Sequence, residues 1–178
     1  MAERTISTER PFAGRLISVR VDRVELANGR SATREIVEHP GAVGILAWDG
    51  ARLALVRQWR HPAGQAMLEI PAGTLDPGEA PRATAERELG EECGLAAATW
   101  EQGPSFFTAP GFCTERLTLF LATDLREDTF ESPEDEELEL EWLPLAKAIA
   151  AVDHGRVIDA KSVAGILWLA HRLESAAP

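Results

Sequence analysis

The chain has 178 residues, 45% of them hydrophobic and 26% charged, which is the composition of one ordinary globular domain. This composition excludes a disordered chain, and 14 glycines with 2 cysteines exclude a collagen-like or disulfide-stapled protein. The net charge of −11 argues against nucleic-acid binding, which needs a cationic surface to meet phosphates. No run of residues is long and apolar enough to cross a membrane, and no signal-peptide core opens the chain. We therefore expect a cytoplasmic protein with no membrane partner.

Strand-like patterns occupy most of the chain outside three helical segments. The pair Asn28-Gly29 favours a hairpin between the first two strands, because both residues accept positive φ. The predicted strands are 15–26, 31–38, 41–48, 52–58, 65–71, 100–108, 117–124 and 139–143.

Three helices are expected, at 81–93, 144–152 and 159–173. Pro81 suits a first helical turn and Gly94 suits a helix end. The last helix presents one apolar face made of Val163, Ile166, Leu167 and Ala170. Strands that precede, flank and follow a central helix predict a mixed α/β (α+β) fold with mixed or antiparallel sheets, not a doubly wound parallel sheet.

The chemically informative residues lie on the central helix. Glu88, Glu91 and Glu92 are spaced by three and four positions, so they share one helical face. Arg87 is the only base among them, and we expect it to point elsewhere. A carboxylate cluster of this kind attracts a hard divalent cation. On its own, however, a glutamate-rich helix is more often a solvated charged face.

The spacing of residues around this helix resembles the Nudix box, Gly-x5-Glu-x7-Arg-Glu-U-x-Glu-Glu-x-Gly-U with U aliphatic. Every specified position matches: Gly73, Glu79, Arg87, Glu88, Leu89, Glu91, Glu92, Gly94 and Leu95. The resemblance implies a Nudix-type α/β/α sandwich with an N-terminal antiparallel strand pair. It also implies N-terminal strands over 1–40 that are exchanged in a homodimer, followed by a catalytic domain over 41–178.

The same resemblance implies two to three Mg²⁺ or Mn²⁺ ions at each site. Glu88 and Glu92 would be direct ligands, Glu91 would share a second ion, and the carbonyl of Ala72 would complete the set. Such ions neutralise a substrate diphosphate and activate water for its hydrolysis. Arg87 and Glu79 would brace the loop and the helix through an ion pair.

Residues outside the box indicate which Nudix group the chain is similar to. Pro110, placed beyond the box in the stretch 107–115, marks the ADP-ribose pyrophosphatase group. The segments 34–43, 55–60 and 68–73 also look like that group. The implied reaction is metal-dependent hydrolysis of ADP-ribose to AMP and ribose 5-phosphate. Taken alone, Pro110-Gly111 would indicate no more than a turn.

The group's substrate-binding residues map onto several positions of this chain by resemblance. Arg60, and with less support Arg57, would contact the phosphates, since a guanidinium fork suits them. Arg34 and Glu35 would lie at the adenine and Glu115 at the terminal ribose, all three from the partner subunit. The ribose and diphosphate pocket would be lined by Thr74, Ala109, Pro110 and Gly111.

The acidic loop before the last strand would carry the carboxylate that acts on water. By resemblance, Glu134 is the catalytic residue and Glu136 a metal ligand. A slip of one or two residues would move these roles to Asp135 or Glu137. If no loop residue acts, Glu91 becomes the alternative base.

Two other readings of the function remain open at this point. Some members of the group that the chain resembles stack adenine on an aromatic residue of the N-terminal strand, and the corresponding region 14–17 has none, which leaves base selectivity undecided. One reading keeps the enzyme class and changes the substrate to another nucleotide sugar, a dinucleotide such as FAD, or an oxidised nucleotide. A non-catalytic nucleotide-binding regulator is a further alternative, although such a module could lose the glutamates that this chain retains.

Overall fold

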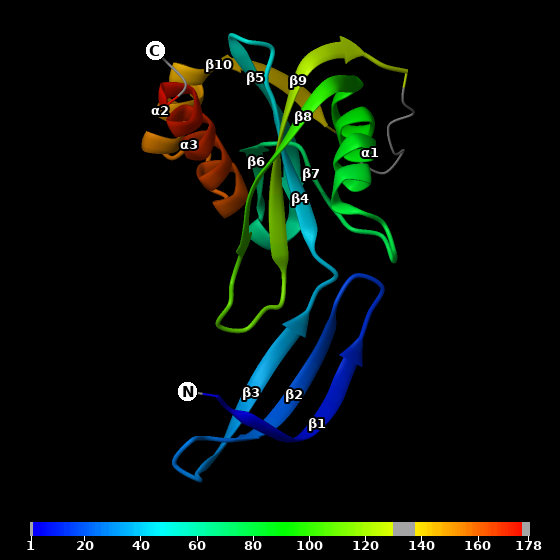
Figure 1. The fold of residues 1–178 in the computed structure, drawn as a ribbon, viewed down its shortest axis with the longest axis vertical. Coiled ribbons are helices and arrows are strands. Elements are labelled where there is room, and N and C mark those ends of the chain that lie inside the picture. The colour runs from blue at the N-terminus through cyan, green and yellow to red at the C-terminus, as the bar shows by residue number, and fades with distance from the viewer. Residues whose placement is uncertain (1, 130–137, 176–178) are drawn as a thin grey trace. The chain divides into compact units, whose positions relative to one another are not determined.

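The computed structural model describes residues 2–129 and 138–175. The chain divides into two compact units, which are described separately. The first contains residues 1–41 and 106–116, and the second contains 42–105 and 117–178. In Figure 1 the first unit carries the N-terminal strands and the second carries the helices.

The first unit is built on one antiparallel sheet in the order β1-β2-β3. Its strands are β1 (Arg4–Ala13), β2 (Ser18–Glu25) and β3 (Ser31–Glu38). The predicted hairpin between β2 and β3 is confirmed, with Ser18 opposite Glu38 and Glu25 opposite Ser31. Within this hairpin loop Gly29 has a positive φ of 78° and Asn28 does not, so the turn uses the left-handed region once rather than twice.

The strand β1 is absent from the sequence prediction, so the expected strand pair is in fact part of a three-stranded sheet. All ten residues of β1 are exposed, and the strand contains Pro11. It therefore has no alternation of buried and exposed positions that a sequence pattern could reveal. Proline is tolerated here because the strand lies at the edge of its sheet.

The second unit contains two sheets. One has four strands in the order β7-β4-β9-β8, in which β4 runs parallel to β9 and antiparallel to β7. The other is antiparallel, in the order β10-β5-β6. The strands are β4 (Ala42–Ala47), β5 (Arg52–Arg60), β6 (Gln65–Glu69), β7 (Ala72–Thr74), β8 (Leu95–Phe107), β9 (Arg116–Glu127) and β10 (Glu139–Pro144).

In residues 2–129 and 138–175, α-helices lie on the two sides of these sheets, as Figure 1 shows. They are α1 (Pro81–Cys93), α2 (Leu145–Asp153) and α3 (Ala160–Ser175), with a short 3₁₀ turn, η1 (His61–Ala63), between β5 and β6. The chain thus forms the expected mixed α/β fold with helices on both sides of its sheets. None of the helices in residues 2–129 and 138–175 is long and apolar enough to span a membrane.

The buried strand β4 separates two cores because its side chains alternate between the faces of the sheet. Val43 and Ile45 belong to the apolar cluster that includes Ala85 and Leu89 of α1. Leu46 lies on the other face, where Gly165 of α3 approaches closely. Each core fixes one helix against the same strand.

The buried face of α3 differs from the predicted one. Its buried residues are Ser162, Gly165, Ile166 and Leu169, whereas Leu167 is 45% exposed. Gly165 allows the helix to approach Ile70 and Leu46 closely, which turns this small-residue side inward. A prediction based on large apolar residues alone therefore places the buried face of α3 a fraction of a helical turn away from its observed position.

Candidate active site

The helix α1 and the strand β7 carry the residues of the candidate site in the second unit. Ala85 and Leu89 anchor α1 in the core and fix the orientation of its other face. Pro81 opens the helix, and Gly94 ends it with a left-handed φ of 63°, its N–H donating to Gly90 O at 2.8 Å. The helix bounds agree with the predicted ones.

The carboxylate of Glu88 occupies the space above Gly73 of β7. A Cβ at residue 73 would lie only 1.8 Å from Glu88 Oε1, so no other residue fits there without moving this carboxylate. The side chain of Glu88 is 13% exposed. The glycine therefore creates the place in which Glu88 is held.

Glu92 approaches the same strand one helical turn further on. Its carboxylate Oε2 accepts a hydrogen bond of 2.9 Å from the backbone N–H of Ala72, and the residue is 9% exposed. Two glutamates of α1 thus lie against two successive residues of β7. This arrangement brings the predicted ligands Glu88, Glu92 and Ala72 into one neighbourhood.

Arg87 connects the remaining carboxylates of the box. Its Nη1 lies 2.7 Å from Glu88 Oε1 and 2.8 Å from Glu91 Oε2. Its Nη2 lies 3.1 Å from Glu79 Oε2, as the expected brace requires. Hydrogen bonding to Glu79 and the surrounding carboxylates raise the pKa of Arg87 above its ordinary value. The expectation that Arg87 points away from the glutamates of the helix is wrong, because its guanidinium contacts Glu88 and Glu91 as well as Glu79.

Glu79 anchors the loop that leads into α1. It accepts hydrogen bonds from Thr84 Oγ1 at 2.9 Å and from the N–H of Asp76 at 3.3 Å, in addition to Arg87. The hydrogen bond from Arg87 is the main reason why the pKa of Glu79 lies below its ordinary value. The loop before the helix is therefore held by a charged residue, Glu79, in addition to the apolar packing of Leu75 against the core cluster.

A second group of charges lies where β5, β6 and α3 meet. Arg60 donates two hydrogen bonds to Glu69, at 3.0 and 2.7 Å, and Lys161 also contacts Glu69. Sequence reasoning named Arg60 but missed Glu69 and Lys161. An acidic residue between buried Leu68 and Ile70 is the signal that could have found this group, because buried charges require partners.

The other predicted residues of the second unit have less distinctive surroundings. Arg57 forms an ion pair of 3.1 Å with Glu141 across the β5–β10 pair. Thr74 lies on β7 and its carbonyl accepts a long contact of 3.4 Å from Arg87. Within the residues that the structure describes, no three His, Cys, Asp or Glu side chains are arranged as a ready metal site. Glu134 and Glu136 lie outside the described residues.

The first unit carries the remaining predicted residues. Arg34 of β3 forms an ion pair with Glu3, while its neighbour Glu35 is exposed. Ala109, Pro110 and Gly111 form a turn in which the N–H of Cys113 donates to Ala109 O at 2.9 Å. The side chain of Glu115 accepts a hydrogen bond from Thr108 beside this turn. The roles assigned to these residues stay predictions.

The chain matches two models of known protein families. Residues 38–164 match the NUDIX domain, and residues 3–37 match the nucleoside diphosphate sugar hydrolase N-terminal domain. The first match covers more than half of the chain, so this protein belongs to the NUDIX domain family.

Particular relatives are similar over nearly the whole chain. An ADP-ribose pyrophosphatase of Bacillus subtilis is 42% identical over 95% of this chain and 93% of its own. A methanol dehydrogenase activator of Bacillus methanolicus is 42% identical over 94% and 92%. An ADP-ribose pyrophosphatase of Mycobacterium tuberculosis is 42% identical over 92% and 81%. The prediction of a Nudix hydrolase similar to ADP-ribose pyrophosphatases is confirmed.

A solved structure supports the fold independently. The crystal structure of an ADP compounds hydrolase superposes with a TM-score of 0.89, covering 99% of this chain and 97% of the other. The two sequences are 24% identical, so this likeness concerns the fold. The expected Nudix-type architecture is thereby confirmed.

Proposed function

We propose that this protein hydrolyses the diphosphate bond of ADP-ribose to give AMP and ribose 5-phosphate, using divalent cations. The observation that carries the proposal is the seating of Glu88 over Gly73 and of Glu92 on Ala72. It is supported by the relatives named ADP-ribose pyrophosphatase. ADP-ribose is itself a nucleoside diphosphate sugar, the substrate class in the name of the N-terminal family.

The donors gathered at β7 and α1 fit Mg²⁺ or Mn²⁺. They are oxygen atoms: the carboxylates of Glu88 and Glu92, the carbonyl of Ala72, and the carboxylate of Glu91 nearby. Glu136 is proposed as a further ligand from the sequence alone. When bound, two to three such ions neutralise the diphosphate and activate water for attack. The present contacts of Arg87 with Glu88 and Glu91 would then be shared with the cations.

The protein's own side chains bind the substrate and accept the proton of the attacking water. Arg60 binds a phosphate through the guanidinium edge that faces away from Glu69, and Arg57 gives a second cationic contact. Thr74 lines the ribose and diphosphate pocket. Glu134 accepts a proton from the attacking water, with Glu91 as the alternative base.

The proposed enzyme is a homodimer in which the first unit completes the partner's site. Arg34, Glu35, Glu115 and the turn at 109–111 serve the substrate in this arrangement. The support is the small sheet of the first unit, which leaves Ile6, Phe12 and Leu16 at 45–54% exposure in the single chain. Light scattering should give twice the 19.4 kDa chain mass, and an active monomer would contradict this part of the proposal. The cytoplasmic location stays a prediction from the sequence.

The proposal is tested by identifying the products of ADP-ribose treated with purified protein. EDTA should abolish hydrolysis and added Mg²⁺ or Mn²⁺ should restore it, with AMP and ribose 5-phosphate formed in equal amounts. Full activity in metal-free buffer would contradict the metal requirement. Formation of ADP and free ribose instead would contradict cleavage of the diphosphate bond.

One relative favours a second candidate function. The activator from Bacillus methanolicus is as similar to this chain as the pyrophosphatases are, so a role in activating a dehydrogenase is an alternative. The two candidates differ in their need for a second protein. ADP-ribose turnover by this protein alone supports the first, whereas a rate increase in a purified methanol dehydrogenase without such turnover would support the second.

A further inference from the structure

A buried carboxylate, Glu69, holds two basic side chains from different elements. Its side chain is 1% exposed and lies at the end of β6. Arg60 Nε and Nη2 bind its two oxygens at 3.0 and 2.7 Å, which is the bidentate geometry of a guanidinium on a carboxylate. Lys161 of α3 contacts the same carboxylate and also lies 2.8 Å from Asp159.

The charges of this group balance, and the group is fixed at each end. Asp159 Oδ1 accepts the N–H of Ser162 at 3.1 Å, which caps the start of α3. Ser162 Oγ in turn accepts the N–H of Ile70 at 2.8 Å, directly after Glu69. Burial opposes ionisation of Glu69, but Arg60 and Lys161 outweigh it, so the pKa of Glu69 lies below its ordinary value. Glu69 is therefore a buried, charged partner for Arg60 with a second cationic contact to Lys161.

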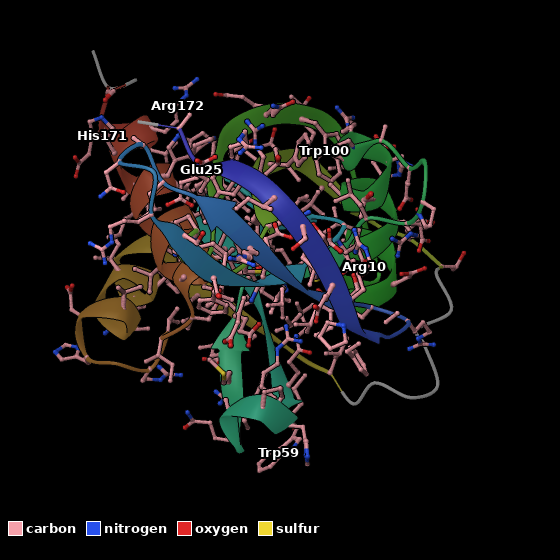
Figure 2. The ribbon with its side chains drawn as sticks, turned by 90° about the horizontal axis from the view of Figure 1, so that it is seen from below. Arg10, Glu25, Trp59, Trp100, His171 and Arg172 are labelled. Atoms are coloured by element: carbon pink, nitrogen blue, oxygen red, sulfur yellow. The ribbon has the colours of Figure 1, made fainter. Side chains whose placement is uncertain are left out.

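The orientation of Arg60 follows from this partner and from its place on the strand. Neighbouring residues of β5 point to opposite faces, and Figure 2 shows Trp59 directed away from the β5–β6 hairpin. Trp59 is 61% exposed, whereas Arg60 turns to Glu69. Only two residues separate Glu69 from Ala72, and Arg60 lies close enough to Glu92 to interact with it electrostatically. The guanidinium therefore lies within electrostatic range of one carboxylate of α1, that of Glu92.

We propose that Glu69 and Lys161 are positioning residues that hold the Arg60 guanidinium in the orientation in which it binds a substrate diphosphate. Glu69 uses one edge of the guanidinium and leaves the other edge for phosphate oxygens. Lys161 contacts the same oxygen, Oε2, that Arg60 Nη2 contacts, so Glu69 keeps a second cationic partner from α3 when substrate leaves. This inference rests on the proposed function, because it assigns Arg60 to the diphosphate.

Two simpler accounts make different predictions. If Glu69 only balanced the charge of Arg60, its neutralisation would increase the local positive potential and strengthen phosphate binding. If the group only stabilised the fold, its loss would lower the melting temperature without a selective effect on the diphosphate. Positioning instead predicts weaker binding in spite of the added positive charge.

The decisive experiment is calorimetric titration of the full chain with inorganic pyrophosphate in the presence of Mg²⁺. Glu69→Gln should weaken binding about tenfold, which is the effect of one lost charge-assisted contact. Arg60→Met should weaken it at least as much, and adding Glu69→Gln to Arg60→Met should have no further effect. Unchanged or tighter binding by Glu69→Gln, or additive losses in the double variant, would overturn the proposal.

A second variant keeps the test valid if Glu69→Gln does not fold. Glu69→Asp retains the charge and shortens the side chain by one methylene. A positioning role predicts that this variant binds pyrophosphate more weakly, whereas a role in charge balance alone predicts unchanged binding. The matched control is Glu101→Gln, which removes the carboxylate from the exposed pair with Arg172 and should leave binding unchanged. Figure 2 labels Arg172 on α3.

Kinetics separates this inference from the proposed function. If the wild-type protein hydrolyses ADP-ribose, Glu69→Gln should raise KM about tenfold and change kcat much less, because the lost contact serves ground state and transition state alike. A lower kcat at unchanged KM would overturn the positioning role alone. If the wild-type protein does not hydrolyse ADP-ribose, the proposed function fails and the pyrophosphate titration still decides the role of Glu69.

Discussion

The carboxylate of Glu88 lies so close above Gly73 that a Cβ at residue 73 would meet Glu88 Oε1 at 1.8 Å. This contact links the first residue of the box to a glutamate fifteen positions later, on a different element. It explains in physical terms why the spacing of the motif begins with glycine. The absent side chain is what allows the carboxylate to lie next to the backbone of β7.

Gly73→Ala is expected to abolish most activity while the protein remains folded. The new methyl group must displace the Glu88 carboxylate, which swings away at a cost of about 1–3 kcal/mol in stability. We expect kcat to fall on the order of 10²-fold or more, measured with ADP-ribose at saturating Mg²⁺.

Gly155→Ala is the matched control for this variant. It also adds a methyl group, but in open space and at a positive φ of 70°, so it should cost about 1–2 kcal/mol of stability and leave kcat unchanged. Equal kinetic effects of the two variants would mean that Gly73 matters for folding rather than for placing Glu88.

The glutamates on α1 should separate into ligands and surface residues. Glu88→Gln or Glu92→Gln keeps the side-chain shape and should lower kcat on the order of 10²-fold or more. Glu86→Gln on the same helix removes only an exposed pair with Arg82 and should change kcat less than twofold. Comparable losses at all three positions would contradict the assignment.

Stability should depend on pH through Glu79. The pKa of Glu79 is lowered in the folded protein, so its contribution is complete above the unfolded-state value of about 4.3. It is lost as the pH falls through the lower folded-state pKa. We expect the urea midpoint to fall between about pH 5 and pH 3, and to fall less steeply in Glu79→Gln. Identical slopes for both proteins would show that Arg87 does not stabilise the charged form.

We expect substitutions in the acidic loop to change kcat and KM differently from substitutions in the Nudix box. A group that acts on water in the transition state affects turnover more than binding. Glu134→Gln should therefore lower kcat sharply and change KM no more than a few-fold, whereas Asp135→Asn and Glu137→Gln should be tolerated. A large loss in Glu137→Gln with near-normal Glu134→Gln would move the role along the loop.

How far the sequence predicts this structure depends on the kind of signal that each element carries. The helix α1 is predicted to its end residues because proline, glycine and an apolar stripe mark both termini and one face. The strand β1 is missed because all its residues are exposed and no alternation exists to be read. The face of α3 is misplaced because its closest contact is made by Gly165, which hydrophobic patterns ignore.

The candidate site likewise contains some features that the sequence predicts and others that only the structure shows. Fixed spacing predicts that Glu88 and Glu92 share a face, and the structure adds that they lie against β7. The reach of Arg87 to three carboxylates depends on a flexible side chain, whose direction spacing does not determine. The contact between Glu69 and Lys161 joins residues 92 positions apart, so only the folded chain reveals it.

The most direct test of the proposed activity is kcat/KM for a panel of substrates at one Mg²⁺ concentration. The panel contains ADP-ribose, an ADP-hexose, FAD and an oxidised nucleoside triphosphate, each followed by release of its nucleotide product. We predict that ADP-ribose has the highest kcat/KM, by at least about tenfold, because the proposed site would hold a diphosphate between two riboses. A higher value for any other member of the panel, or no turnover of ADP-ribose, would contradict the proposal.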